Sequence, residues 1–259
     1  MKRCAGVALL IWLIAPGLAA APPVVSDLAD QAVLVHRITK SACLMVSGAD
    51  TPVHGEDVAA STAALSALTQ GSTGIIDGPV PLRRNVDVLN RSALQIAAGD
   101  RHSVPFALML RMNMQLSQHY SDLRARSIAA EPAPHAAAHA LVHELRVASQ
   151  AFQRDLCLYL TDLATPMVAH DMDARLAFFG HSVSALLAGD PDQSVPPPPT
   201  IHIKIALGKV ESKWRTLEPI LAQASSGHAI EPRDAQLASV LGDAILRNLD
   251  EIADRFQNL

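Results

Sequence analysis

The segment "ELRVASQAFQRDLCLYL", Glu144 to Leu160, carries two stripes of side chains that one helix would present in two directions. The first stripe is apolar and steps by fours and threes, the spacing of a helix face buried in a bundle. The second is mostly polar and steps at the same spacing one residue further on, about 100° around the helix. The segment therefore predicts a helix that packs against its own bundle and against a second surface. The first stripe consists of Leu141, Leu145, Ala148, Phe152, Leu156, Tyr159 and Leu163, and the second of Arg146, Gln150, Gln153 and Cys157.

The pattern around this segment also occurs earlier in the chain. "RITKSACLMVSG" matches "AFQRDLCLYLTD" when Cys43 is aligned with Cys157, an offset of 157 − 43 = 114 residues, and the apolar stripe is preserved. "LSALTQGS" matches "VSALLAGD" in the same way, and each closes on a glycine that suits a helix end, Gly71 and Gly189. Two further apolar segments follow in the same order in both halves. The offsets grow only between segments, so we expect two copies of one unit that differ by loop insertions.

Both copies have the composition of helical protein. Aromatic residues make up 3% of the chain, and the alternation of β-branched residues that is typical of strands is almost absent. Four amphipathic helices bury their apolar faces most simply as an antiparallel bundle. We therefore predict an all-α chain of two homologous antiparallel four-helix bundle units, at residues 25–127 and 135–259. The proline-rich stretch from Gly189 to Thr200 falls inside the second unit as a loop.

The N-terminus has the layout of a secretory signal peptide. Lys2 and Arg3 precede an apolar run, and two small residues, Gly17 and Ala19, stand before a predicted cut after residue 19. A retained membrane anchor is the alternative, although the apolar run is short for a span of about 20 residues. We expect the signal peptide, residues 1–19, to be removed and the protein to be exported to a bacterial periplasm.

Charge and motifs argue against two classes of function. The formal net charge is −4 with the basic residues of the leader included, and no basic run that would suit nucleic acid follows the leader. The sequence contains no glycine-rich phosphate loop, HExxH, Gly-x-Ser-x-Gly or CxxCH motif. We therefore expect neither a nucleic-acid partner nor an enzyme, and no cofactor.

Four short motifs carry a resemblance to a known family. "LRVASQ" (Leu145 to Gln150) and "RITK" (Arg37 to Lys40) match the two ends of a run close to "LRMLSQRIAK", and "VSALLAGD" and the helix of Trp214 match the two later helices of that family's domain. This order of motifs resembles the N-terminal sensor domain of type IV pili methyl-accepting chemotaxis transducers, which is similar to the periplasmic domain of nitrate/nitrite sensors. The resemblance implies a non-enzymatic periplasmic sensor-like module that signals through a membrane sensor or transducer protein.

The resemblance also implies a ligand site. The arginine position of the family falls on Arg146 in the second copy and on Ala32 in the first, so nitrate specificity does not carry over. On this hypothesis Arg146, with Ser149 and Gln150, binds a small anion between packed first helices, because a guanidinium fork fits planar oxyanions. The alternative is a structural or protein-interaction module, in which the polar stripe docks the other copy or a second chain of a homodimer.

Cysteines and histidines give two further hypotheses. Cys43 and Cys157 would be bridged if the copies pack about a pseudo-two-fold axis with their first helices together, and would be buried core residues if the copies stack end to end. His135, His139 and His143 lie on one face of "HAAAHALVH", where two histidines four apart could bind zinc, copper or nickel. Three on one straight helix span about 12 Å and cannot share one ion, so a periplasmic metal binder is the second alternative function.

Overall fold

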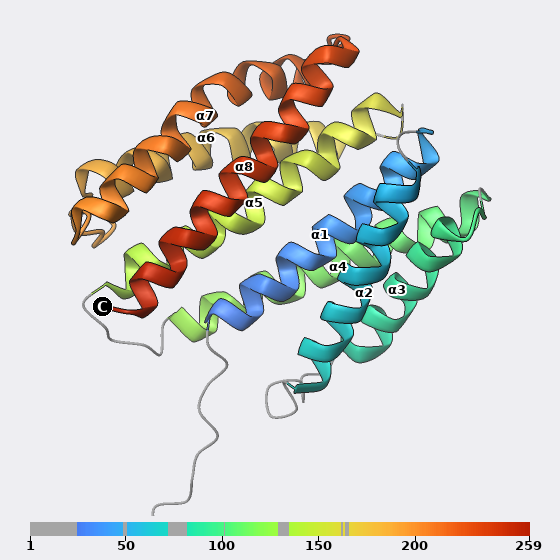
Figure 1. Cartoon of the computed structure of the whole chain (residues 1–259), viewed down its shortest axis with the longest axis horizontal. Coiled ribbons are helices and arrows are strands. Elements are labelled where there is room, and N and C mark those ends of the chain that lie inside the picture. The colour runs from blue at the N-terminus through green and yellow to red at the C-terminus, as the bar shows by residue number, and fades with distance from the viewer. Residues whose placement is uncertain are drawn as a thin grey trace, which may run out of the picture.

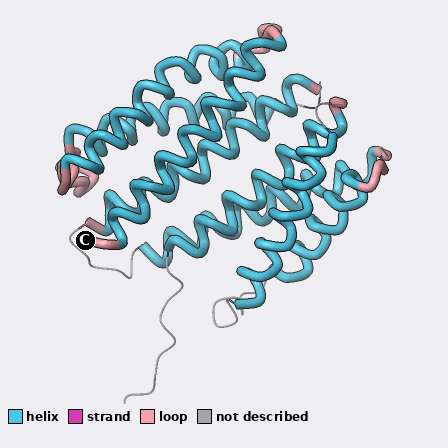
Figure 2. The backbone as a smooth tube through the Cα atoms, viewed as in Figure 1, coloured by secondary structure: helices cyan, strands magenta, loops and turns pink. Residues whose placement is uncertain are grey.

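The structure is a computed structural model that describes residues 25–48, 51–71, 82–100, 102–128, 135–161, 163 and 166–259. The named elements in these ranges are all helices, and no strand occurs among them (Figure 2). The predicted all-α class is therefore confirmed, whereas the predicted signal peptide at residues 1–19 lies outside the described residues. The helices are α1 (Val25–Val46), α2 (Thr51–Gly71), α3 (Leu82–Ala97), α4 (Ser103–Ile128), α5 (Ala136–Leu160), α6 (Pro166–Ala188), α7 (Ile201–Ser225) and α8 (Pro232–Gln257).

The eight helices surround two hydrophobic cores. Helices α1 to α4, here the N-terminal bundle, pack around one core, which also takes in Cys157 and Leu158 of α5. Helices α5 to α8, the C-terminal bundle, pack around the other. Apolar residues that align between the two halves of the sequence occupy corresponding places. Val86 and Leu89 of α3 lie in the N-terminal core, and their aligned counterparts Leu207 and Val210 of α7 lie in the C-terminal core. Each apolar stripe is thus removed from water within its own bundle.

The two bundles meet where α1 and α5 lie side by side and run in the same direction (Figure 1). Asp30 pairs with Arg146 toward the beginning of both helices, and Cys43 is bonded to Cys157 toward their ends. We call this contact the seam. Each of the two helices therefore packs on two faces, and α5 is buried at every position from 148 to 158.

The loop between α6 and α7 is shaped by its end residues, and its position inside the second half of the chain is as predicted. Gly189 has a φ of +83°, which favours glycine and lets the chain leave α6. A Cβ at this position would lie 3.1 Å from the Pro197 ring. Thr200 then caps α7 by accepting a hydrogen bond from the backbone N–H of Ile203.

None of the described helices combines the length and the apolar character that a membrane span requires.

Candidate functional site

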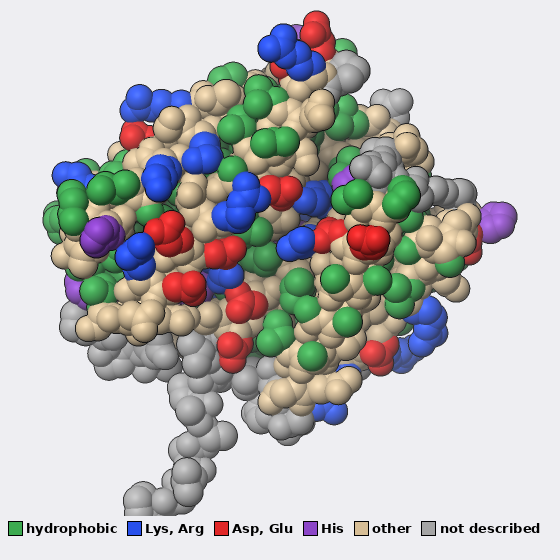
Figure 3. Space-filling model, in the orientation of Figure 1, with side chains coloured by type: hydrophobic (Ala, Val, Ile, Leu, Met, Phe, Trp, Pro, Cys, Tyr) green, Lys and Arg blue, Asp and Glu red, His purple; other side chains and the backbone are tan. Residues whose placement is uncertain are grey.

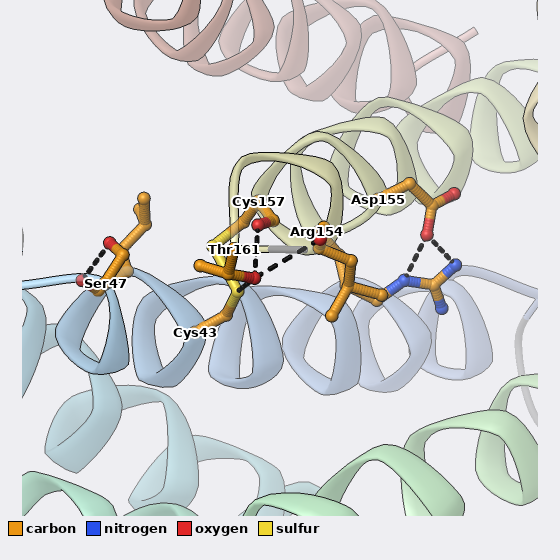
Figure 4. Close-up of a disulfide and its surroundings, with 8 residues drawn as sticks. Cys43, Ser47, Arg154, Asp155, Cys157 and Thr161 are labelled. Atoms are coloured by element: carbon orange, nitrogen blue, oxygen red, sulfur yellow. Dashed lines mark hydrogen bonds and ion pairs between the residues drawn. A yellow bond between two sulfur atoms is a disulfide. The ribbon is translucent and has the colours of Figure 1, made fainter. Parts of the chain in front are cut away.

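A disulfide crosslinks the seam. It joins Cys43 of α1 to Cys157 of α5, whose Cα atoms lie 6.3 Å apart (Figure 4). Thr161 lies beside the bridge, with its Oγ1 3.8 Å from Cys43 Sγ. The first helices of the two bundles lie together with equivalent cysteines facing each other, which is the arrangement for which the sequence predicts a bridge.

Arg146 spans the seam and is paired with acidic residues from both bundles. Its Nη2 lies 2.7 Å from Asp30 Oδ1 on α1, and its Nε lies 2.7 Å from Asp250 Oδ1 on α8. Its Nη1 donates to His143 Nδ1 at 3.0 Å. All three guanidinium nitrogens therefore have partners within the chain. An anion at Arg146 would have to compete with two carboxylates that already neutralise it.

The other two residues of the predicted anion site also lie along the seam helix α5. Ser149 donates a 2.7 Å hydrogen bond to the backbone oxygen of Arg146. Gln150 is completely buried, and neither its Oε1 nor its Nε2 has a hydrogen-bond partner within the described ranges. The structure thus brings Arg146, Ser149 and Gln150 close together on one helix, but none of them lines the cavity that lies between α4, α5 and α6.

The side of the seam that faces α2 and α8, here the closed side, is filled by side chains. Lys40 Nζ donates to Gln153 Oε1 at 3.1 Å and to Asp243 Oδ1 at 3.2 Å, and Gln153 Nε2 donates to the same Asp243 oxygen at 3.0 Å. Gly242 permits this approach, because a Cβ there would lie 2.5 Å from Gln153 Nε2. The space that remains is about 30 Å³, room for little more than a water molecule. Figure 3 shows acidic and basic side chains interspersed where the bundles meet on this face.

The side that faces α4 and α6, here the open side, holds a cavity of about 550 Å³. Helices α4 and α6, which lie behind α1 and α5 in Figure 1, form its walls, and α5 with His36 of α1 forms its floor. Cavities of roughly 300–1,000 Å³ are typical of small-molecule sites. The apolar part of the lining includes Leu110, Met114, Val147, Leu158, Val168 and Phe178.

The polar floor of this cavity is organised by a carboxylate that is fully buried. Asp155 of α5 accepts from Arg154 Nε at its Oδ1, over 2.6 Å, and from Arg175 Nη1 of α6 at its Oδ2. Arg154 Nη1 also donates to Asn113 Oδ1 of α4 at 2.6 Å. Because a buried charge is tolerated only when it is paired, this network fixes α4, α5 and α6 relative to one another at the cavity.

Arg124 of α4 is the second buried arginine of the lining, with 3% of its side chain exposed. Its Nε and Nη2 donate to the two carboxylate oxygens of Glu144 at 2.7 and 3.0 Å, a bidentate pair. Its Nη1 is buried and has no hydrogen-bond partner in the part of the chain that the structure describes. A buried donor without an acceptor costs free energy.

His36 supplies an uncharged donor to the same region. Burial lowers the pKa of His36 well below its usual value near 6.5, and the charges of Arg154, Arg175 and Arg124 lower it further. Arg154 Nη1 donates to His36 Nδ1 at 3.2 Å. The neutral ring therefore carries its proton on Nε2, which lies 3.4 Å from Ser117 Oγ.

The histidine row considered for metal binding lies at the start of α5. The Nε2 atoms of His139 and His143 are 2.9 Å apart. Burial lowers the pKa of His143, and together with the charges of His139 and Arg146 it brings this pKa to about 2. Within the described ranges no group of three or more metal-ligating side chains comes together, so the metal-binding alternative finds no ligand set there.

A larger depression, of about 640 Å³, lies where α3 turns into α4. Most of the side chains around it, including Arg91, His102 and Val104, are exposed. A ligand there would stay hydrated, whereas the cavity on the open side offers buried polar groups beside an apolar wall. The open side is therefore the better candidate site.

Sequence reasoning did not select the residues that build this site. The one signal available was the adjacent charged pair Arg154 and Asp155 inside an otherwise apolar helix segment, which only a buried partner on another helix would accommodate. Arg124, Arg175 and His36 stand on other helices, where nothing in the local sequence marks them as neighbours.

Comparisons with protein-family models, with curated proteins and with solved structures found no match for this chain. Its function is therefore inferred from the cavity, the seam and the sequence features.

Proposed function

We propose that this protein is an exported, non-enzymatic, sensor-like module that binds a small ligand in the cavity on the open side of its seam. The observation that carries the proposal is the combination of a cavity of about 550 Å³ with a buried arginine, Arg124, whose Nη1 has no acceptor among the described residues. Preformed cavities with a few convergent polar groups and an apolar wall are the usual form of a ligand site.

This proposal moves the anion site of the sequence hypothesis from Arg146 to the cavity. The guanidinium of Arg146 already bonds Asp30 and Asp250, so it has little to gain from a further anion. Arg124 and Arg175 line the cavity, and Arg175 uses only its Nη1 for a hydrogen bond within the described residues.

The location of the cavity also suits a module that reports to a partner. A ligand held between α4, α5 and α6 contacts both bundles, so its affinity depends on how the bundles are placed. Export to the periplasm is supported by the leader sequence and by a disulfide that suits an oxidising compartment. A membrane sensor or transducer is the partner that the family resemblance suggests.

A thermal-shift screen of residues 20–259, with the disulfide intact, tests the proposal. The screen holds nitrate, nitrite, sulfate, phosphate, small carboxylates, neutral amphiphiles and divalent metals, since any ligand of the folded state raises the melting temperature by mass action. Ala151→Phe is the blocking variant, because Ala151 lines the cavity and belongs to neither core. Ala59→Phe, at an exposed position of α2, is the matched control.

We expect at least one compound to raise the melting temperature of the wild type and of Ala59→Phe but not of Ala151→Phe. Arg146→Ala should lower the melting temperature, because Asp30 and Asp250 lose their partner, yet keep the shift caused by the ligand. A shift that survives Ala151→Phe and disappears in Arg146→Ala would return the site to Arg146. No shift with any compound would contradict the ligand-binding proposal.

The second candidate is a structural or protein-interaction module without a small ligand. The seam favours it, because the polar stripe of α5 is engaged by the other bundle: Arg146 with Asp30, Gln153 with Lys40 and Cys157 with Cys43. On this alternative the cavity would be incidental, and the thermal-shift screen would stay negative.

A further inference from the structure

From the two halves of the cavity we propose that the ligand is an organic anion with a single carboxylate head on an apolar body, such as a medium-chain fatty acid. This inference deepens the proposed function and rests on it. The head would lie among the arginines of the lining, and the body would lie along the apolar wall.

The polar half of the cavity carries more positive charge than its bonded carboxylates neutralise. Arg124, Arg154 and Arg175 bond to two carboxylates, Glu144 and Asp155, which leaves one positive charge in excess. His36 adds no negative charge and is itself neutral. The remaining charged residue of the lining, Asp171, is exposed to solvent at the cavity, where water screens it.

Donor groups also outnumber acceptors in this half. Arg124 Nη1 is buried without an acceptor, and Arg175 uses its Nη1 for Asp155 while its guanidinium lies over the Phe152 ring at 5.8 Å. Arginine donors with no acceptor favour a planar oxyanion over a hydroxyl or an ammonium group. One excess charge fits one carboxylate, and Glu144 beside the site would repel a second anionic group.

The apolar part of the lining needs an apolar occupant. Met114, Leu163 and Phe178 line it and are partly exposed, although they are large hydrophobic side chains. Together with Leu158 and Val168 they form an apolar wall between α4, α5 and α6. An aliphatic chain would remove this surface from water, which favours binding. A sugar, a nucleotide or a bare inorganic anion would leave it exposed.

Calorimetric titration with four probes of matched or reduced size tests the inference. The probes are decanoate, 1-decanol, decyltrimethylammonium and acetate, each added to the disulfide-bonded chain 20–259. We expect decanoate to bind at least tenfold more tightly than decanol or decyltrimethylammonium, and acetate to give no measurable binding. Decanoate binding should be lost in Ala151→Phe and kept in Ala59→Phe, which separates the cavity from surface adsorption.

A double variant tests the role of the arginine. Arg124→Gln with Glu144→Gln removes the pair without leaving one buried charge alone, and its matched control is Arg215→Gln with Glu211→Gln, an exposed pair of the same kind on α7. We expect the first double variant to bind decanoate at least tenfold more weakly, with decanol unchanged. The control should bind decanoate as the wild type does.

The outcomes distinguish this inference from the proposed function. If decanol or decyltrimethylammonium binds as tightly as decanoate and Ala151→Phe abolishes that binding, the ligand site stands and the anion class is overturned. If no decyl probe binds while another compound of the thermal-shift screen does, the amphiphile class is overturned and the site again stands. If no compound binds in either experiment, both proposals are overturned.

Discussion

The two sides of the seam are built on the same pair of helices and differ in the volume of the space that remains between their side chains. The closed side, around Lys40 and Asp243, retains about 30 Å³, whereas the open side, around Arg154 and Asp155, holds about 550 Å³. When Cys43 is aligned with Cys157, Lys40 aligns with Arg154, so similar cations stand at equivalent places. The two sides therefore differ in the partners of these cations and in the placement of the flanking helices, because α6 packs less closely on α5 than its counterpart α2 packs on α1.

The charged side chains also differ at positions that are equivalent in the two halves of the sequence. On the closed side Ser41 of α1 donates to Asp57 of α2, and on the open side Asp155 of α5 accepts from Arg175 of α6. Ser41 aligns with Asp155, and Asp57 aligns with Arg175, so the acid has changed helix between the two halves. An acid on the seam helix is fully buried and draws two arginines around it, which leaves a polar floor beneath an open space.

Replacement of the buried acid should destabilise the open side, and we expect this variant to lower the free energy of unfolding the most. Asp155→Asn would leave Arg154 and Arg175 without the carboxylate that pairs them, and Asp155 is fully buried. Loss of one partner of a buried ion pair costs about 3–5 kcal/mol. We expect the free energy of unfolding in urea to fall by about 3 kcal/mol, measured with the disulfide intact. A loss below about 1 kcal/mol would mean that the acid is dispensable to the open side.

Removal of the disulfide should loosen both sides of the seam together. In the double variant Cys43→Ala, Cys157→Ala the unfolded chain is no longer crosslinked over 114 residues, which typically costs about 2–4 kcal/mol. We expect the urea midpoint of the wild type to fall to that of the variant when a reductant is added, and the midpoint of the variant to be insensitive to reductant. A wild type that responds to reductant no more than the variant does would contradict this role of the bridge.

The sequence was sufficient to predict the helical class and many residues of both cores, although Leu163 of the predicted apolar stripe lies beyond α5 and is exposed. The apolar stripes repeat at threes and fours and carry their information locally, so spacing alone assigns Val86 and Val210 to a buried face, and both lie in a core. The second stripe of α5 also indicated a second packing surface. That this second surface is α1 depends on how the two bundles dock. The spacing of residues along the sequence is compatible with both end-to-end and side-by-side packing.

The candidate site was much less accessible to sequence reasoning. Arg146 was chosen because a family motif covers it, but its two carboxylate partners, Asp30 and Asp250, lie on other helices and far away in the sequence. The cavity is formed where α4 and α6 stand apart across α5. A separation between helices depends on tertiary packing, so no local pattern around Arg124 or Arg175 predicts it.

The open side has a buried histidine among its arginines, which gives it a pH dependence. Because burial and the three arginines lower the pKa of His36 in the folded state, the unfolded chain binds a proton first as the pH falls below about 6.5. Stability is therefore present at neutral pH and is lost on acidification, by up to about 1.4 kcal/mol per pH unit for one proton.

His36→Gln should reduce the loss of stability on acidification by the contribution of one bound proton. An amide can accept from Arg154 and donate to Ser117, so the fold should be kept. The measurement is the free energy of unfolding from pH 7 to about pH 5, above the range where most carboxylates titrate. His143, whose pKa is lowered to about 2, contributes a second proton that remains in this variant, and His143→Gln serves as its counterpart. Identical slopes in wild type and His36→Gln would show that His36 is protonated in the folded state.

Replacement of the acid on the closed side should have the smallest effect. Asp243 is 43% exposed, whereas the Lys40 side chain it pairs with is 8% exposed. In Asp243→Asn the buried lysine keeps its 3.1 Å bond to Gln153 Oε1 and its charge interaction with Asp57, so most of its stabilisation remains. We expect a loss below about 1 kcal/mol that shrinks further in high salt, and no change in decanoate binding. Equal losses for Asp243→Asn and Asp155→Asn would mean that burial of the acid does not separate the two sides, and the contrast would then rest on the cavity volume alone.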